Sequence, residues 1–326
     1  MSIPFDFQQL IAPFDKQEFI SNYYEKKPLV IRRGDPQYYE RLLSVKDIDT
    51  IIKTGIEQGN LQLTMSHAAK KILPADYMSG WSNDRVIVQT GINQNKVFER
   101  FVQDKATMII HNTLRYNAAL QDLVSSVDAS FGCNSGVNVF ITPSNAQCFQ
   151  VHYDEHDLFI IQISGSKRWK LFESAVYLPL EPQNKRAVDF SGLALLEDIC
   201  LEQGDLLYLP RGFVHEVTTT DQLSCHITLG LMNMSWIKRF ADHLTQVALE
   251  DEPIFRKAYL GSANRSVEEL QHIVLQLRKT LAQHLSVDAI QAYLDQQAIK
   301  TQKQDAISVP SLAAIAAAEV HPINVK

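Results

Sequence analysis

Two short motifs carry side chains that could bind a metal ion. In the first, VHYDEHD, His152 and Asp154 are two residues apart, a spacing that puts both side chains on one face of an extended strand. In the second, GDLLYLPRGFVHEV, His215 follows a Pro and Gly turn, 215 − 152 = 63 residues after His152, which allows a return from across a barrel. Two histidines and one carboxylate, with the other positions of an octahedral ion open, are the ligand set of non-haem Fe(II) oxygenases.

A lysine follows the first motif at a turn. Lys167 lies 167 − 152 = 15 residues after His152, just past Gly165, where we expect it to begin a strand antiparallel to the one after Asp154. Its surroundings are apolar: Phe159, Ile161, Trp169 and Leu171. An ammonium group at the mouth of an apolar barrel is costly unless it meets an anion, such as the distal carboxylate of a keto-diacid. The alternative, which position alone favours, is a lysine that reaches solvent from a hairpin.

The motifs lie in a segment with the pattern of a sandwich or barrel. From Gly136 to Met232, short β-branched and aromatic runs alternate with Gly, Pro, Asn and Ser at intervals of about 8 to 15 residues. Ser164-Gly165-Ser166 is predicted to be a hairpin turn. The expected strands are Val137 to Thr142, Cys148 to Tyr153, Leu158 to Ile163, Arg168 to Phe172, Leu206 to Leu209, His215 to Thr219 and Ser224 to Leu229.

Helical patterns flank this segment. Asp15 with Glu18, and Ser44 with Asp47, predict helix starts, and residues 96–127 carry helix-compatible spacing. We therefore expect a helical N-terminal shell to about residue 130 and a barrel over residues 131–235. Ser266 with Glu269 predicts a capping box before a further amphipathic helix, so residues 236–326 should form a helical extension.

Composition excludes several classes of protein. The chain has 326 residues, 45% of them apolar, and 31 Lys plus Arg against 37 Asp plus Glu give a net charge of −6. That balance argues against direct, primary nucleic-acid binding, which needs a basic surface. No apolar run is long enough to span a membrane and no secretory signal is visible, so we expect a cytoplasmic protein. Its four cysteines form no CxxC pair, which argues against a disulfide framework or a thiolate zinc site.

The run HYDEHDLFIIQISGSKRWKLF, followed by GDLLYLPRGFVHEV and SCHITLGL, resembles the JmjC-type (cupin-like) 2-oxoglutarate oxygenases, and specifically their ribosomal oxygenase branch. The earlier stretch YYEKKPLVIRR resembles the N-terminal segment of that branch, and the second motif fits the cupin pattern G-x5-P-x-G-x2-H. The resemblance covers residues 14–235. It implies a mainly β fold, a double-stranded β-helix (jelly-roll/cupin) barrel with a helical N-terminal shell and an α-helical C-terminal extension.

The resemblance also implies roles for individual residues. The three ligand candidates match the iron ligands of the family: His152, Asp154 and His215. Lys167 matches the residue that pairs with the distal carboxylate of 2-oxoglutarate, Asn138 matches an asparagine near this co-substrate, and Thr228 falls among further polar co-substrate contacts. Gly230 departs from the pattern, because several relatives carry a serine there; Thr228 is then the substitute we expect for the missing hydroxyl group.

Four other residues of these motifs have alternative interpretations. His156 shares the strand parity of His152 and could be a fourth ligand, but a fourth ligand would block an open position, and the family commonly has another aromatic residue there. We expect it to support the ligands or to face the substrate. Cys148 is expected in the core, and Tyr208 and Arg211 are expected to be structural or to line the mouth.

The implied activity uses Fe(II), 2-oxoglutarate and dioxygen, and gives succinate, carbon dioxide and a hydroxylated C–H bond. The branch implies a protein or peptide substrate, namely an Arg or His side chain of a ribosomal protein. One alternative is a hydroxylase of a small molecule, amino acid or natural-product peptide. Another is a cupin that binds metal for non-oxidative chemistry or has no turnover; Lys167 and Asp154 argue against it, since a plain cupin usually has histidine at the second position.

The C-terminal segment has its own implied role. Relatives carry a helical dimerisation region after the barrel and then a winged-helix domain, and 326 − 235 = 91 residues are short for both in full. We therefore expect a homodimer formed by amphipathic helices between about Trp236 and Leu285, with a reduced winged-helix-like module.

Overall fold

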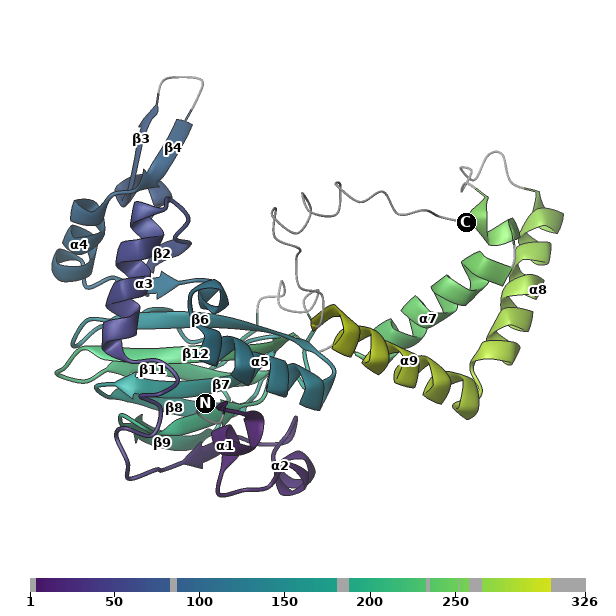
Figure 1. Cartoon of the computed structure of the whole chain (residues 1–326), viewed down its shortest axis with the longest axis horizontal. Helices are drawn as coiled ribbons and strands as arrows, with labels where there is room; N and C mark the ends of the chain where they lie inside the picture. The colour runs from purple at the N-terminus through teal and green to yellow at the C-terminus, as the bar shows by residue number, and fades with distance from the viewer. Residues whose placement is uncertain are drawn as a thin grey trace, which may run out of the picture. The chain divides into compact units, whose positions relative to one another are not determined.

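Two antiparallel sheets form the framework that carries both motifs (Figure 1). The computed structural model describes residues 4–82, 87–180, 188–232, 235–251, 253–257 and 266–305. The larger sheet has the strand order β1 (Leu29–Ile31), β10 (Leu206–Leu209), β7 (Asp157–Ser164), β12 (Ser224–Met232), β6 (Asn134–Thr142), β5 (Thr107–Ile110) and β2 (Leu63–Ser66). The smaller sheet has the order β11 (Phe213–Thr219), β8 (Lys167–Ser174) and β9 (Leu195–Leu201).

The strand β7 shows how the two sheets are held together. Phe159 and Ile161 belong to the large core that also contains side chains of the N-terminal helices, whereas Leu158 and Ile160 belong to a second core shared with the smaller sheet. Successive side chains of a strand point to opposite faces, so the continuous run Leu-Phe-Ile-Ile fills both cores. The predicted mainly β core is confirmed.

Helices cover the face of the larger sheet that turns away from the smaller one (Figure 1). In chain order they are α1 (Phe7–Ile11), α2 (Lys16–Asn22), α3 (Val45–Glu57), α4 (Gln94–Gln103) and α5 (Ala118–Phe131), with short 3-10 helices at Pro74–Asp76 and Thr113–Tyr116. The predicted helix starts are confirmed: the Asp15 carboxylate accepts from the backbone N–H of Glu18 at 2.8 Å, and Ser44 and Asp47 form a reciprocal capping box.

The N-terminal shell also contains strands: β1 lies at Leu29–Ile31, where an extended segment was predicted, and four further strands were not located by the sequence pattern. β2 and β5 extend the larger sheet, and β3 (Met78–Ser82) pairs with β4 (Ile87–Ile92) in a separate ribbon. β5 lies within residues 96–127, between α4 and α5, a range in which the sequence analysis noted helix-compatible spacing. The strand forms there because it pairs with β6, a partner that is distant in sequence.

Two expectations about the barrel are wrong. The segment Cys148 to Tyr153 is not a strand: it is irregular and makes a single β-bridge, between His152 and His215. Ser164-Gly165-Ser166 does bend the chain, but β7 and β8 do not pair as a hairpin, since they belong to different sheets. The bend carries the chain from one layer to the other.

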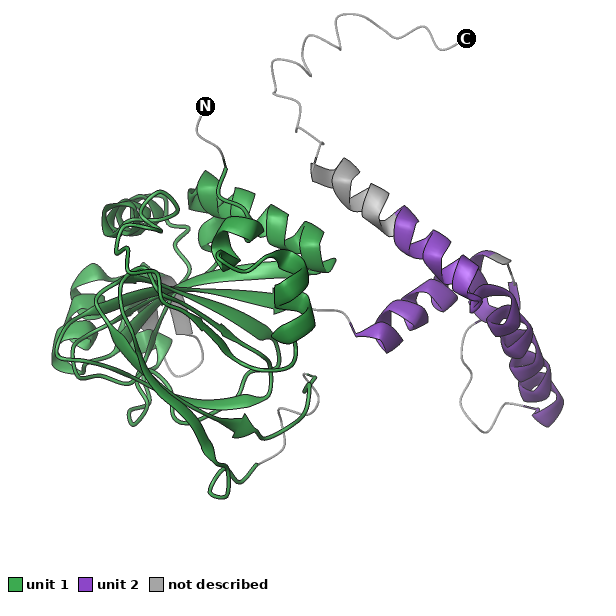
Figure 2. Ribbon diagram, turned by 90° about the horizontal axis from the view of Figure 1, so that it is seen from below, with its two compact units in different colours: residues 1–233 green, residues 234–326 purple. Residues whose placement is uncertain are grey.

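Residues 234–326 form a second compact unit (Figure 2). Its described elements are α7 (Trp236–Asp251), a 3-10 helix at Pro253–Arg256, α8 (Val267–His284) and α9 (Val287–Asp305). Ser266 caps α8 by accepting from the backbone N–H of Glu269 at 3.0 Å, which confirms the predicted helix start. The Ala-rich tail after residue 305, where a winged-helix-like module was expected to continue, lies outside the described residues. None of the helices described in either unit has the length and apolar character required to cross a membrane.

Candidate active site

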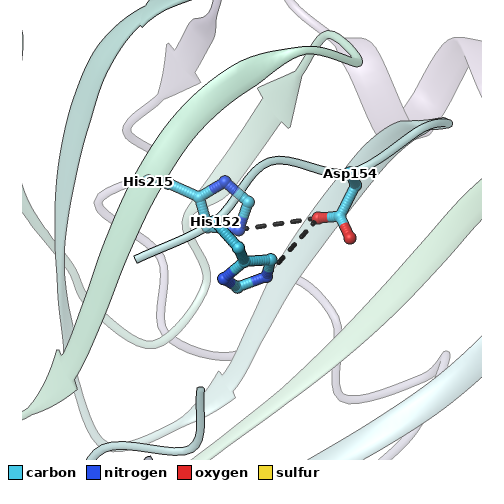
Figure 3. Close-up of side chains that lie close together, drawn as sticks. All are labelled: His152, Asp154 and His215. Carbon is cyan, nitrogen blue, oxygen red and sulfur yellow. Dashed lines mark ion pairs between the residues drawn. The ribbon is translucent and has the colours of Figure 1, made fainter. Parts of the chain in front are cut away.

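Three side chains converge beside the inner face of the smaller sheet (Figure 3). One ligand atom from each of His152, Asp154 and His215 lies within 4.8 Å of the other two. Oδ2 of Asp154 is 3.9 Å from Nε2 of His152 and 3.5 Å from Nε2 of His215. These separations exceed ordinary hydrogen bonds, whereas ligand atoms about 2.1 Å from one ion, at right angles, lie about 3 Å apart. The cluster therefore has the donor types and nearly the spacing of a metal site.

Both imidazoles present the same nitrogen to this cluster. Nδ1 of His152 lies 2.7 Å from the carbonyl oxygen of Gln150, and Nδ1 of His215 lies 3.2 Å from that of Phe213. A carbonyl oxygen only accepts hydrogen bonds, so each Nδ1 carries the proton and each Nε2 keeps its lone pair. This is the tautomer that a metal ion needs.

Backbone contacts hold His215 beside His152 and Asp154, although His215 follows His152 by 63 residues. The N–H of His215 donates to the carbonyl of His152 at 2.8 Å, and the N–H of His152 returns the contact at 3.2 Å. The N–H of Gly212 donates to the carbonyl of Asp154 at 2.9 Å. Gly212 has φ +89°, and a Cβ there would collide with the carbonyl of Val176, so the turn before His215 requires glycine.

Burial sets the protonation of His215. The side chain is 3% exposed, and burial, together with the nearby His152, lowers its pKa to about 4. The ring is therefore neutral at pH 7 and able to bind a cation. Asp154 and His152 are half-buried, so the cluster is accessible from one side.

Lys167 is buried at the opposite end of the inner face of the barrel. It is 2% exposed; its Nζ donates to Oγ1 of Thr142 at 3.0 Å and lies 3.5 Å from Nδ1 of His226. Burial lowers its pKa to about 8. Among the described residues, no carboxylate pairs with Lys167. The alternative of a lysine that reaches solvent from a hairpin is thus wrong, because this side chain turns inward.

An aromatic wall lies between the lysine and the three-residue cluster. The rings of His226 and Phe140 stack with centroids 4.8 Å apart, and the ring of Trp169 is 6.0 Å from His226 and 5.8 Å from His215. His226 is 3% exposed, and burial and the Lys167 charge lower its pKa well below the ordinary value. Neither His226 nor Thr142 was among the predicted site residues. A signal was present for His226, since His226 and Thr228 alternate with apolar residues in SCHITLGL.

Asn138 and Thr228 lie directly opposite each other on β6 and β12. Both are half-buried, and neither side chain has a hydrogen-bond partner in the part of the chain that the structure describes. Their polar groups face the same interior as His226, two residues further along each strand. The structure therefore places both of them where a bound ligand could use them.

The other residues of the motifs have structural contacts. Tyr208 is fully buried; its hydroxyl donates to Asp157 at 2.8 Å and accepts from the N–H of Glu25 at 2.9 Å. Arg211 is 8% exposed and forms an ion pair with Glu25 at 2.7 Å. Cys148 is 6% exposed and lies in the core. The contacts of Tyr208 and Arg211 join the barrel to the N-terminal segment. None of these residues belongs to the metal-ligand cluster, which consists of the three ligand candidates.

Known proteins show the same domain. Residues 109–238 match the family model for the JmjC domain. The chain is 28% identical over 316 residues to ribosomal oxygenase 1 of Gallus gallus, covering 90% of this chain and 49% of the relative. It is 29% identical over 322 residues to the bifunctional lysine-specific demethylase and histidyl-hydroxylase NO66 of Aedes aegypti, covering 91% and 47%. The chain thus spans about half the length of these curated relatives.

A solved structure shares the fold. The ribosomal oxygenase YcfD of Escherichia coli, in complex with cobalt and 2-oxoglutarate, superposes with a TM-score of 0.50 and 16% identity, covering 88% of this chain and 71% of that one. The predicted cupin-like fold class is confirmed by this similarity. Residues 109–238 therefore match the JmjC domain, and the chain is similar in sequence to the ribosomal oxygenases over 90% of its length.

Proposed function

We propose that this chain is an Fe(II)- and 2-oxoglutarate-dependent oxygenase that hydroxylates an unactivated C–H bond of a protein side chain. The observation that carries the proposal is the pairing of a His-Asp-His cluster with a buried lysine that has no acidic partner among the described residues. One half suits a metal ion and the other half suits an anion. A co-substrate that chelates iron and carries a second carboxylate satisfies both.

The donor set fits iron. His152, Asp154 and His215 would hold the ion through two neutral imidazole nitrogens and one carboxylate oxygen, which leaves other positions for ligands. When bound, iron supplies the oxidising chemistry with dioxygen that no amino-acid side chain can provide. The buried, neutral His215 and the two carbonyl-oriented imidazoles already have the protonation that the ion needs, and the three side chains need only move closer together.

The remaining residues would bind and shield the co-substrate. Lys167 would hold the distal carboxylate of 2-oxoglutarate in a charge-assisted contact, and Asn138 and Thr228 would donate hydrogen bonds along the molecule. The aromatic wall of Phe140, Trp169 and His226 would exclude water from the space between lysine and metal. Positioning is thus the contribution of the chain, and reactivity is that of the metal.

We propose an Arg or His side chain of a ribosomal protein as the target. The names of the relatives support this proposal, since they describe ribosomal oxygenases and a histidyl-hydroxylase. Ribosomal proteins are generally basic, and a chain with a net charge of −6 would attract them. A protein substrate rather than nucleic acid, and action in the cytoplasm, stay predictions; fractionation of cells would check the compartment.

The test is co-substrate turnover followed by substrate oxidation. Purified protein with Fe(II) and 2-oxoglutarate should release succinate, and Asp154→Ala, which removes the carboxylate ligand, should release none while keeping the far-UV circular dichroism of the parent. Ribosomal proteins incubated with the enzyme should gain the mass of one oxygen atom. Succinate release without any protein oxidation would favour the small-molecule alternative, and turnover by Asp154→Ala would refute the site.

We further propose that the second unit forms a homodimer. Helices α7 and α8 expose large apolar side chains, among them Trp236 at 65%, Ile237 at 71%, Val267 at 67% and Leu275 at 63%. Such surfaces are costly in water and typical of association sites. Solution scattering at micromolar concentration should give the mass of two chains, and a monomer would contradict the proposal.

A further inference from the structure

The ring of His156 covers the backbone of Gly230. A β-carbon at Gly230 would lie 2.7 Å from Cδ2 and 3.0 Å from Nε2 of His156, so the imidazole occupies the space that a side chain at position 230 would need. Gly230 is buried although it has no side chain of its own. The absence of a β-carbon at position 230 is what allows the ring to lie there.

The strand register shows where this contact lies. On β12 and β6 the facing pairs are Ser224 with Thr142, His226 with Phe140, Thr228 with Asn138, and Gly230 with Gly136. Directly opposed residues, and residues two apart, share one face of a sheet. Gly230 therefore faces the barrel interior, at the end of a row that begins near Lys167.

Exposure increases along this row, except at Gly230, which is buried under the ring of His156. Thr142 is fully buried and His226 is 3% exposed, whereas Asn138 and Thr228 are half-buried and Met232, beyond Gly230, is 51% exposed. The barrel interior is therefore closed at the lysine and opens toward Gly230. A ligand held by Lys167 occupies the closed part, so a second, larger molecule must arrive from the end where His156 lies.

The metal cluster lies at the same open end. His215 pairs with Leu171, four residues along β8 from Lys167, a distance of about 13 Å at 3.3 Å per residue. Gly230 is likewise four residues along β12 from His226, which contacts Lys167. His156 itself follows the ligand candidate Asp154 by two residues. The imidazole thus lies at the same end of the barrel as the metal cluster.

We infer that His156 contacts the target side chain and helps to select it. The inference rests on the proposed function. Within the described ranges the ring has no hydrogen-bond partner, and its Cδ2–Nε2 edge lies over Gly230, so Nδ1 is the nitrogen most available to a substrate. An imidazole nitrogen accepts a hydrogen bond from an N–H group, which matches a planar, nitrogen-bearing target such as Arg or His. Position 230 has no side chain that could contact the target, so the His156 ring that covers it makes this contact.

The test compares co-substrate binding with substrate oxidation. The variants are His156→Ala, Gly230→Ala and the double variant, with Gly136→Ala as the matched control, since a Cβ there meets only Cε of Met232, at 3.9 Å. The probes are two degenerate peptide libraries with a single fixed Arg or His. Affinity for 2-oxoglutarate is measured by calorimetry on Mn(II)-loaded protein, and oxidation of the libraries by mass spectrometry.

His156→Ala should keep its 2-oxoglutarate affinity within about twofold while its kcat/KM for the preferred library falls at least about tenfold. The kcat/KM of Gly230→Ala should fall by a similar factor, because the new methyl group displaces the His156 ring. The kcat/KM of the double variant should be no lower than that of His156→Ala, since both changes remove the same contact. Any loss caused by Gly136→Ala should instead multiply with the loss caused by His156→Ala when the two changes are combined. His156→Asn should recover part of the loss, because its amide can also accept a hydrogen bond.

Each other outcome overturns the inference. Unchanged kcat/KM in His156→Ala would show that the ring does not touch the target, and an equal loss of 2-oxoglutarate affinity would place it in the co-substrate site. Multiplicative losses of kcat/KM in the double variant would show that His156 and Gly230 act independently and not through one shared contact. Succinate release by the wild type without oxidation of either library would remove the target class, whereas no succinate at all would mean that the proposed function itself has failed.

Discussion

Replacing Lys167 by methionine should stabilise the ligand-free protein and abolish its affinity for 2-oxoglutarate. Burial lowers the pKa of Lys167 from 10.5 to about 8, and this difference means that the charged side chain costs the folded state about 3 kcal/mol at pH 7. Methionine has a similar length and fills the same space without the charge. It loses the hydrogen bond to Thr142, worth about 1 kcal/mol, so the net gain is about 2 kcal/mol.

The pH dependence has a definite sign. The pKa of Lys167 is lower in the folded protein than in the unfolded chain, so between about pH 8 and pH 10.5 the unfolded chain binds more protons. The stability of the wild type therefore rises with pH across this window. The advantage of Lys167→Met should be complete below about pH 8 and lost by about pH 10.5.

The assay is urea unfolding at pH 7 and pH 9.5, with calorimetric titration of 2-oxoglutarate on the same samples. Lys170→Met is the matched control: it lies on the same strand, its ammonium is partly exposed and pairs with Glu216 at 3.0 Å, and its loss should change stability by less than about 1 kcal/mol. A Lys167→Met protein that is less stable than the wild type at pH 7 would refute the reasoning. An equal advantage at both pH values would refute it too, because the difference would then not come from the charge.

Three further predictions concern single contacts. Thr142→Val removes the oxygen that accepts from Lys167, so it should lower the stability by about 1–3 kcal/mol at pH 7, and by less at pH 9.5, in the same urea assay. Gly165→Ala should cost more than about 3 kcal/mol, because Gly165 has φ +62° and a Cβ would collide with the carbonyl of Leu223; soluble yield and thermal unfolding would report it. His215→Ala should weaken Mn(II) binding at least about 100-fold by electron paramagnetic resonance, since one of three ligands is lost; unchanged binding would contradict the ligand assignment.

The sequence located the three ligand candidates by residue type and order, but not by the geometry that brings them together. Strand parity predicts that His152 and Asp154 share a face, yet this segment is irregular. Their proximity comes instead from the bridge between His152 and His215 and from the N–H of Gly212, which holds the carbonyl of Asp154. These contacts span about sixty residues, so no local pattern could have revealed them.

The lining of the proposed co-substrate space was the least predictable part. Thr142 and His226 reach Lys167 because β6, β12 and β8 face one another across two sheets, and the pairing of those strands is not local. The strand β9 was also missed, because its first four residues are all exposed and show no alternation of apolar and polar side chains. The three helix starts that were predicted, at Asp15, Ser44 and Ser266, are correct, since a cap depends on residues only three apart.

The buried charge of Lys167 is a stronger argument for anion binding than the sequence motif around it. A cost of about 3 kcal/mol is a large part of the 5–15 kcal/mol by which typical domains are stable. The ionisable side chains nearest to the ammonium are Cys148, Cys225 and His226; burial raises the pKa values of both thiols, that of Cys225 to about 12, and keeps His226 neutral, so none of the three carries a compensating charge at pH 7. An apolar residue would make the fold more stable, so stability cannot explain a lysine here. Binding can, because an anion that enters from the open end removes the cost when it arrives.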